Sequence, residues 1–210
     1  IGGIANFTYL PGNMNITEIL CTDTGPGNTM MDAFIQQHFK GKHFDKDSVI
    51  ALKGNINNEL LFALKDNAFF KQALPKTTGP ELFNLDYLQQ AKEKSLTTML
   101  SVEDTMATLN KFSADTIIDA LLKTISKDVS IKIYASGGGM HNPLLMQHIK
   151  AALPNCEFLT TADLDIEPDA KEAVLFAVLA NECICGDGSY LQKGNLSIPA
   201  ISMGKISFPS

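Results

Sequence analysis

The sequence contains no arginine and no tryptophan, and its 17 basic residues are all lysine. Acidic residues number 23, so the formal net charge is −6. Nucleic-acid-binding proteins usually present a basic face and use arginine for bidentate contacts to bases and phosphates. The composition therefore argues against a nucleic-acid partner. Any phosphate group would have to be held by main-chain N–H groups, by lysine or by a metal ion.

Long apolar runs are also missing, and no signal-peptide pattern opens the chain, so we expect a cytoplasmic protein without a membrane partner. Cysteine is scarce: Cys21, Cys156, Cys183 and Cys185 form no CxxC pair. This spacing favours reduced, mostly buried thiols over a metal site or a disulfide framework. Because Ile1 stands inside an apolar stretch, we interpret it as the edge of a fragment.

The order of the predicted elements indicates one α/β domain over residues 1–210. We predict strands at 4–10 and 17–22 that form a hairpin, helices at 28–39, 57–70, 81–91 and 101–126, a strand at 131–135, a helix at 142–153, a strand at 157–160 and a helix at 168–184. In the last helix the spacing of Ala173, Phe176 and Ala177 predicts a buried face.

Three turns combine glycine with the end of a predicted strand. In the first, Gly2 and Gly3 would let the main chain approach a ligand closely and point N–H groups at an anion. A bulge or a tight bend explains the same residues equally well.

The second glycine turn runs from Asp23 through Gly25 and Gly27 to Asn28, which is predicted to cap the next helix. An acid at a strand end can hold a hydrated metal ion or a substrate hydroxyl, and the following helix N-terminus favours a phosphate. The alternative is a tight turn with a helix cap. An aspartic protease is a poor match, because that enzyme needs paired aspartates on a β fold.

The third turn is the run Gly137–Gly139, between a predicted strand and the helix that Asn142 opens. It lacks the GxGxxG spacing of a dinucleotide site. A flat triple-glycine turn can pass beneath a planar base or a sugar, whereas a plain strand-to-helix connection rarely needs three glycines.

Five stretches together resemble the anhydro-N-acetylmuramic acid kinase family, in family order and over nearly the whole chain: IGGIANFTYL, CTDTGPGNTMMDAF, PKTTGPELFN, ASGGGMHNPLLM and DAKEAVLFAVLA. The resemblance implies an actin-like, ribonuclease H-like lobe, with a mixed sheet, an N-terminal antiparallel hairpin and helices on both faces. It would be the second, C-terminal lobe of a two-lobed kinase whose first lobe is absent. Pro80 stands where the family usually has arginine, which weakens any ligand role for its loop.

The resemblance also implies site residues. Nucleotide would be bound by Gly2, Gly3, Asn6, Gly137, Gly138, Gly139 and Asn142; the phosphate, metal or substrate would lie near Asp23, Gly25, Gly27 and Asn28; and Glu172 would bind the sugar. Glu172 can equally be a favourable charge at a helix N-terminus. No residue is predicted to bind a metal directly.

The activity that the resemblance implies is hydrolysis of the 1,6-anhydro ring of anhydro-N-acetylmuramic acid and phosphorylation of O6 from ATP with Mg²⁺. The product, N-acetylmuramic acid 6-phosphate, belongs to peptidoglycan recycling. The catalytic aspartate is expected upstream of Ile1, so this chain alone should be inactive. One alternative is a non-catalytic actin-like module that binds nucleotide or sugar. Another is a structural role, with the hairpin and the helix at 101–126 assembling a homodimer.

Overall fold

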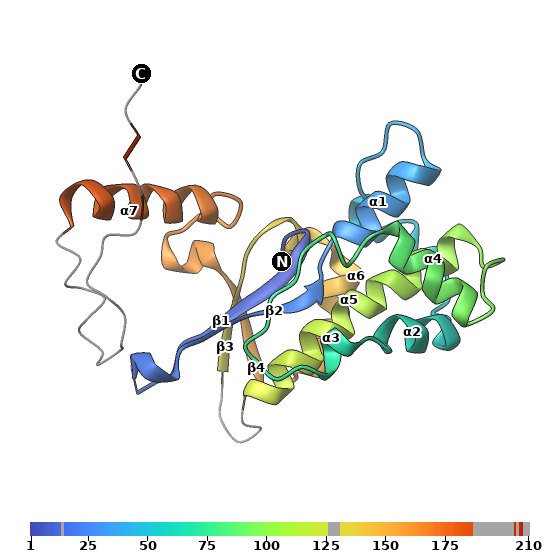
Figure 1. Ribbon diagram of the computed structural model, residues 1–210, viewed down its shortest axis with the longest axis horizontal. Coiled ribbons are helices and arrows are strands. Elements are labelled where there is room, and N and C mark those ends of the chain that lie inside the picture. Colours follow the sequence, from blue (N-terminus) through green and yellow to red (C-terminus); the bar gives the residue numbers. More distant parts are fainter. Residues whose placement is uncertain (14, 126–130, 187–203, 205, 208–210) are drawn as a thin grey trace.

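The computed structural model describes residues 1–13, 15–125, 131–186, 204 and 206–207 (Figure 1). Its strands are β1 (Ile4–Tyr9), β2 (Leu20–Pro26), β3 (Ile131–Ala135) and β4 (Cys156–Thr160). Its α-helices are α1 (Thr29–His38), α2 (Asn58–Lys65), α3 (Ala68–Lys71), α4 (Leu85–Lys94), α5 (Val102–Thr124), α6 (Pro143–Ala152) and α7 (Lys171–Cys185). The predicted α/β class is confirmed.

Several predicted elements differ in their bounds: the strand expected at 17–22 is β2, the helix expected at 81–91 is α4 and the helix expected at 168–184 is α7. The helix expected at 57–70 is divided into α2 and α3, because the side chain of Asn67 accepts a hydrogen bond from the Phe69 amide and starts a new helix. The long helix begins where Ser101 caps it, with Oγ accepting from the Asp104 amide at 3.0 Å. It ends at Thr124, and the expected end at Ser126 lies outside the described residues.

Helix α5 lies at the centre of the fold and joins two apolar clusters (Figure 1). Its N-terminal half packs with α1, α2 and α4 around Phe83 and Phe112, both fully buried. Its C-terminal half packs with α6 and the hairpin around Ala114 and Leu145. One helix therefore connects the cluster around α1, α2 and α4 to the cluster formed by α6 and the hairpin.

The strands hydrogen-bond as two separate pairs among the described residues: β1 runs antiparallel to β2, and β3 runs parallel to β4. The expected hairpin is confirmed, but the single mixed sheet is not. The two pairs are linked instead at the chain's first residue, since the Ile1 amino group donates to the Ser136 carbonyl just beyond β3. A bulge between Ala5 and Asn6 interrupts the hairpin ladder.

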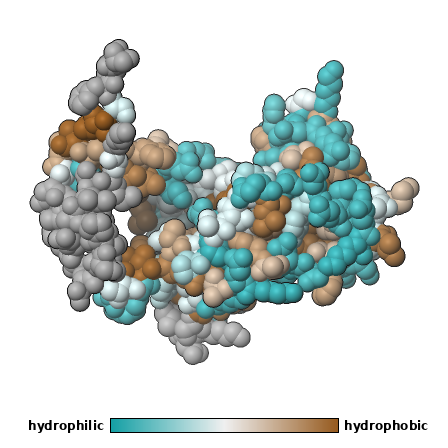
Figure 2. All heavy atoms as spheres, in the orientation of Figure 1, coloured by the Kyte–Doolittle hydropathy of each residue, from teal (hydrophilic) through white to brown (hydrophobic). Residues whose placement is uncertain are grey.

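Helix α7 corrects the prediction of a buried face. It lies across the strands from α5 and α6, yet none of its residues is buried (Figure 1). Phe176 is 66% exposed, and apolar side chains of α7 are visible on the surface (Figure 2). The apolar spacing correctly indicates a helix, but it cannot say whether a partner element covers that face.

The cysteines also depart from expectation. Cys21 and Cys185 are exposed, Cys156 and Cys183 are half-buried, and all four are free thiols. Free thiols agree with the expected reduced state, but Cys21 in β2 and Cys185 in α7 are exposed instead of buried, whereas Cys156 in β4 packs against the core. Across the described ranges, no helix is both long enough and apolar enough to cross a membrane.

Candidate functional site

The first two glycine turns are joined through their main chains. The amides of Gly27 and Thr29 donate to the Gly3 carbonyl at 2.8 and 3.0 Å, and the Asn28 amide donates to the Gly2 carbonyl at 2.9 Å. A Cβ at Gly27 would lie 2.3 Å from the Gly2 oxygen, so only glycine permits this approach. Residues far apart in the sequence thus build one compact loop pair at the start of α1.

The triple-glycine turn joins the same place. The Gly139 amide donates to the Ile1 carbonyl at 2.9 Å, and a Cβ at Gly139 would lie 2.4 Å from the Ile1 side chain. Gly137 has φ +79°, a left-handed conformation that favours glycine. Gly138 differs from both, since the nearest atom to a Cβ there would be Nδ2 of Asn28 at 3.9 Å. Gly138 therefore presents an open side toward Asn28.

The hydrogen bonds limit how an anion could bind here. The amides of Gly27, Asn28 and Thr29 already donate to carbonyls, so they are not free to hold a phosphate in this arrangement. The expected side-chain cap at Asn28 is absent, because its side chain makes no capping hydrogen bond to α1. Its amide group is the donor that faces the triple-glycine turn.

Asp23 lies in β2, where its Cα is paired with that of the exposed Asn6 beside the bulge. Its Oδ2 accepts hydrogen bonds from Thr77 Oγ1 at 2.9 Å and from the Thr78 amide at 2.8 Å. The Asp23 amide donates to the Lys76 carbonyl, so the loop at 76–78 runs along β2. No hydrogen bond to Oδ1 occurs within the described part of the chain. The loop at 76–78 therefore holds one of the two carboxylate oxygens.

Thr77 and Thr78 were not singled out from the sequence. They belong to the PKTTG stretch that resembles the family. Pro80, which follows this stretch in place of the usual arginine, argued against a ligand role for the loop. In the structure both threonines donate hydrogen bonds to Asp23. Thr77 and Thr78 stand three and two residues before Pro80, so the replacement of arginine by Pro80 does not alter these hydrogen bonds.

Asn142 caps α6, and its side-chain oxygen is saturated. Oδ1 accepts from the Leu145 amide at 2.9 Å, from Ser48 Oγ at 2.7 Å and from Asn110 Nδ2 at 3.0 Å. A nucleotide could therefore contact Asn142 only through its Nδ2. Ser48 and Asn110 lie in segments that the sequence analysis did not assign to the site.

Two acids lie near these turns. Glu172 is exposed in the first turn of α7. The pKa of the Ile1 amino group is lowered to about 6, mainly by burial; Lys171 adds to this shift and Glu172 opposes it. Asp32 is one turn beyond Asn28 on α1, and burial raises the pKa of its carboxyl group to about 6. Gly25, the remaining predicted residue, packs against Thr116 of α5.

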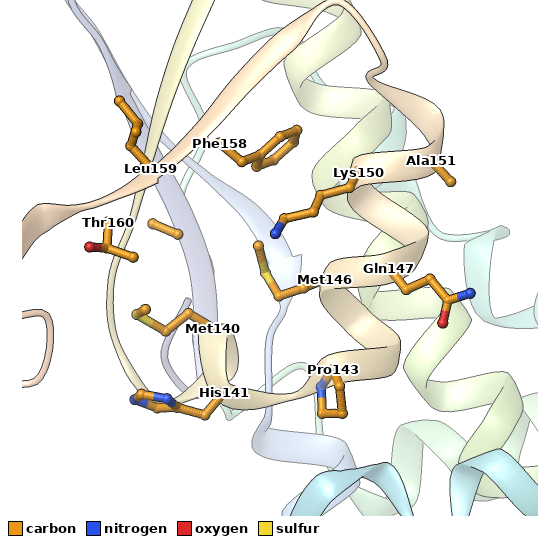
Figure 3. Close-up of a pocket in the computed structure, with 11 residues that line it drawn as sticks. Met140, His141, Pro143, Met146, Gln147, Lys150, Ala151, Phe158, Leu159 and Thr160 are labelled. Carbon is orange, nitrogen blue, oxygen red and sulfur yellow. The ribbon is translucent and has the colours of Figure 1, made fainter. Parts of the chain in front are cut away.

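A cavity of about 790 Å³ opens beside the triple-glycine turn, between α6 and the ends of β3 and β4 (Figure 3). Its walls are largely apolar and include Met140, Met146, Phe158 and Leu159. The amino group of Lys150 points into it, 5.8 Å from the centre of the Phe158 ring (Figure 3). His141 lies at its edge, 3.4 Å from Asp169. This largely apolar lining suits an organic group better than a free ion.

The fold and the site define an α/β protein in which three glycine turns, two from the N-terminal segment and one more than 100 residues later in the sequence, meet beside an apolar cavity. The chain belongs to the anhydro-N-acetylmuramic acid kinase family, whose model matches residues 1–208.

Curated relatives agree. The chain is 51% identical, over 210 residues, to the anhydro-N-acetylmuramic acid kinase of Pseudoalteromonas atlantica, covering 100% of this chain and 52% of that protein. It is 37% identical over 209 residues to that of Caldanaerobacter subterraneus, covering 99% of this chain and 53% of that protein. The chain spans about half the length of the curated relatives it matches.

Proposed function

We propose that this chain is the second lobe of an actin-like, ATP-dependent sugar kinase. In the complete protein it would act in opening the 1,6-anhydro ring of anhydro-N-acetylmuramic acid and phosphorylating O6. The observation that carries the proposal is the meeting of Gly2–Gly3, Gly27–Asn28 and Gly137–Gly139 at one place, in a chain of this family. We also propose a cytoplasmic location and a possible homodimer.

The nucleotide would lie along these turns. Its phosphates would run past Gly2, Gly3 and Asn6, with the Asn28 side chain as a further donor. The adenosine would pass over the open side of Gly138, with its base toward the cavity beside Met140. ATP supplies the phosphoryl group. No cluster of three potential metal ligands occurs in the described ranges, so Mg²⁺ would be held mainly by phosphate and water oxygens.

The sugar would meet carboxylates. The contacts from Thr77 and Thr78 orient Asp23 and leave Oδ1 to accept a hydrogen bond from a sugar hydroxyl or a water molecule. Glu172 would supply a second acceptor for the sugar from the start of α7. The aspartate that activates water is still proposed to precede Ile1, and the Asp23 geometry makes it the first residue of this chain to test for that role.

The test is an ADP-release assay on a full-length protein that contains this chain. It uses ATP, Mg²⁺ and anhydro-N-acetylmuramic acid, with N-acetylmuramic acid and N-acetylglucosamine as comparison sugars. The proposal requires ADP release that depends on the anhydro sugar, and a product whose mass exceeds that of the anhydro sugar by one phosphoryl group and one water molecule. Absence of sugar-dependent ADP release from folded protein would overturn it.

A second candidate is a non-catalytic module that binds nucleotide or sugar. Calorimetry separates the two: ATP binding without sugar-dependent turnover in the full-length protein supports the binding module.

A further inference from the structure

The middle of α5 carries buried polar side chains where an apolar helix face would be expected. Asn110 is 0% exposed and Ser113 is 1% exposed, although both are surrounded by core residues such as Leu109, Phe112 and Ala114. Positions three apart in a helix lie on the same face. Asn110 and Ser113 are therefore neighbours on one buried surface of α5.

These two side chains reach the two turns that precede α1 and α6. Ser113 Oγ donates to the main-chain carbonyl of Gly27 at 2.8 Å. Asn110 Nδ2 donates to Oδ1 of Asn142 at 3.0 Å, immediately after the triple-glycine turn. A single rigid helix thus holds both turns by side chains one helical turn apart.

A third side chain completes the arrangement from the opposite side of Asn142. Ser48 is fully buried; its Oγ donates to Asn142 Oδ1 at 2.7 Å and accepts from the Leu144 amide at 3.3 Å. To place it there, Asp47 and Ser48 both adopt φ +56°, which is unfavourable for residues other than glycine. The Asp45 carboxylate secures this loop by accepting from the amides of Ile50 and Ala51.

The arrangement is not what core stability alone would favour. Oδ1 of Asn110 is buried and has no hydrogen-bond partner among the described residues. A buried amide with an unpaired oxygen is less stabilising than an apolar side chain of similar size. Left-handed backbone at two adjacent residues is a second unfavourable feature. Such features persist where the position of a group matters more than the stability it contributes.

We propose that Ser48, Asn110 and Ser113 are positioning residues that set the spacing between the turn before α1 and the triple-glycine turn. They touch neither the nucleotide nor the sugar; they act through Gly27 and Asn142. The expected effect on ATP binding rests on the proposed function. When the hydrogen bonds of these three residues are lost, the gap between the two turns, which the nucleotide would span, becomes larger. Binding of the sugar, which would depend on Asp23 and Glu172, should change little.

The kinetic test uses Ser113→Ala, Asn110→Leu and Ser48→Ala in the full-length protein. Each should raise KM for ATP about three- to tenfold, the range expected for one lost hydrogen bond, with KM for the sugar within about twofold. Thr105→Val is the matched control, because this buried hydroxyl on the same helix donates only to the Ser101 carbonyl, just before α5. It should leave both constants unchanged.

The structural test needs no activity. Hydrogen exchange on the same proteins should show faster exchange at residues 138–145 for Asn110→Leu and Ser48→Ala, with α4 as protected as in the unmodified protein. Unchanged exchange there in both variants, or an equal change in Thr105→Val, overturns the proposal. If the unmodified protein shows no ATP-dependent turnover, the proposed function fails while the exchange result still decides this inference. Ser48→Ala removes a single oxygen and serves where Asn110→Leu does not fold.

Discussion

Thr77 donates a hydrogen bond of 2.9 Å from its Oγ1 to Oδ2 of Asp23, although the two residues are 54 positions apart in the sequence. The Thr78 amide donates to the same oxygen at 2.8 Å. Both donors therefore act on one oxygen and fix the plane of the carboxylate. The orientation of the Asp23 side chain therefore depends on the loop at 76–78 as well as on β2.

Asp23→Asn in the full-length protein should lower turnover by tenfold or more, which corresponds to about 1.4 kcal/mol of barrier or more. The amide keeps the size of the side chain but cannot accept a proton or accept hydrogen bonds at both positions. Thermal unfolding should change little, because Asp23 is only half-buried. Kinetics that match those of the unmodified enzyme would show that Asp23 has only a structural role. Thr77→Val should show a smaller loss and Thr77→Ser should restore activity.

Gly138→Val should raise KM for ATP strongly and leave thermal stability nearly intact. A Cβ at Gly138 would have only Asn28 within 4 Å, at 3.9 Å, so the valine side chain would extend into the space that we assign to adenosine. Gly139→Ala is the contrasting variant, since its Cβ would collide with Ile1 and destabilise the fold. Calorimetric titration with ATP and a thermal melt on the same preparations check both. Normal ATP affinity in folded Gly138→Val would remove the adenosine assignment.

The difference in exposure predicts a large stability loss for one phenylalanine and a small one for another. Phe112 is fully buried among Phe70, Phe83 and Tyr87, so Phe112→Ala should cost about 3–5 kcal/mol of unfolding free energy. Phe176 is 66% exposed on α7, so Phe176→Ala in this 210-residue chain should change it by about 0.5 kcal/mol or less. Urea denaturation measures both. A large loss for Phe176→Ala would show that α7 is packed in solution.

Asp32 predicts a specific dependence of stability on pH. Burial raises the pKa of its carboxyl group from 3.8 to about 6, so the folded state binds more protons than the unfolded state between these values. The Asp32 contribution to stability therefore falls as pH rises through that window and stays low above it. Asp32→Asn should be relatively more stabilising near pH 7 than near pH 4. Urea denaturation of both proteins at pH 4 and at pH 7 measures the difference, and an equal effect of the substitution at the two pH values would contradict this expectation.

The isolated chain should fold and yet release no ADP above background with ATP and the anhydro sugar. It has two buried apolar clusters of its own, whereas we propose that the water-activating aspartate and the first-lobe phosphate loop belong to the part of the full-length protein outside this chain. The control is the full-length protein in the same assay. Sugar-dependent ADP release by clean isolated chain would show that all the catalytic groups are in these 210 residues.

Much of this protein could be read from local sequence. Capping residues such as Ser101 and Asn142, apolar spacing and the glycine turns determined where helices and strands form, because those signals act within a few residues. The five ordered stretches were enough to indicate the family that the comparisons then showed. Composition alone had already argued against a nucleic-acid partner.

Only the tertiary structure decided what these elements meet. Four features depend on residues far apart in the chain: the division of the strands into two pairs, the exposure of Phe176, the hydrogen bond from Thr77 to Asp23, and the hydrogen bonds from Asn110 and Ser113. Periodicity shows which face of a helix is apolar or polar, but not which atom lies opposite it. From the sequence, Ser113 is only a polar residue on an otherwise apolar helix face. Its hydrogen-bond partner is known only from the structure, because folding brings the Gly27 carbonyl to 2.8 Å from its hydroxyl.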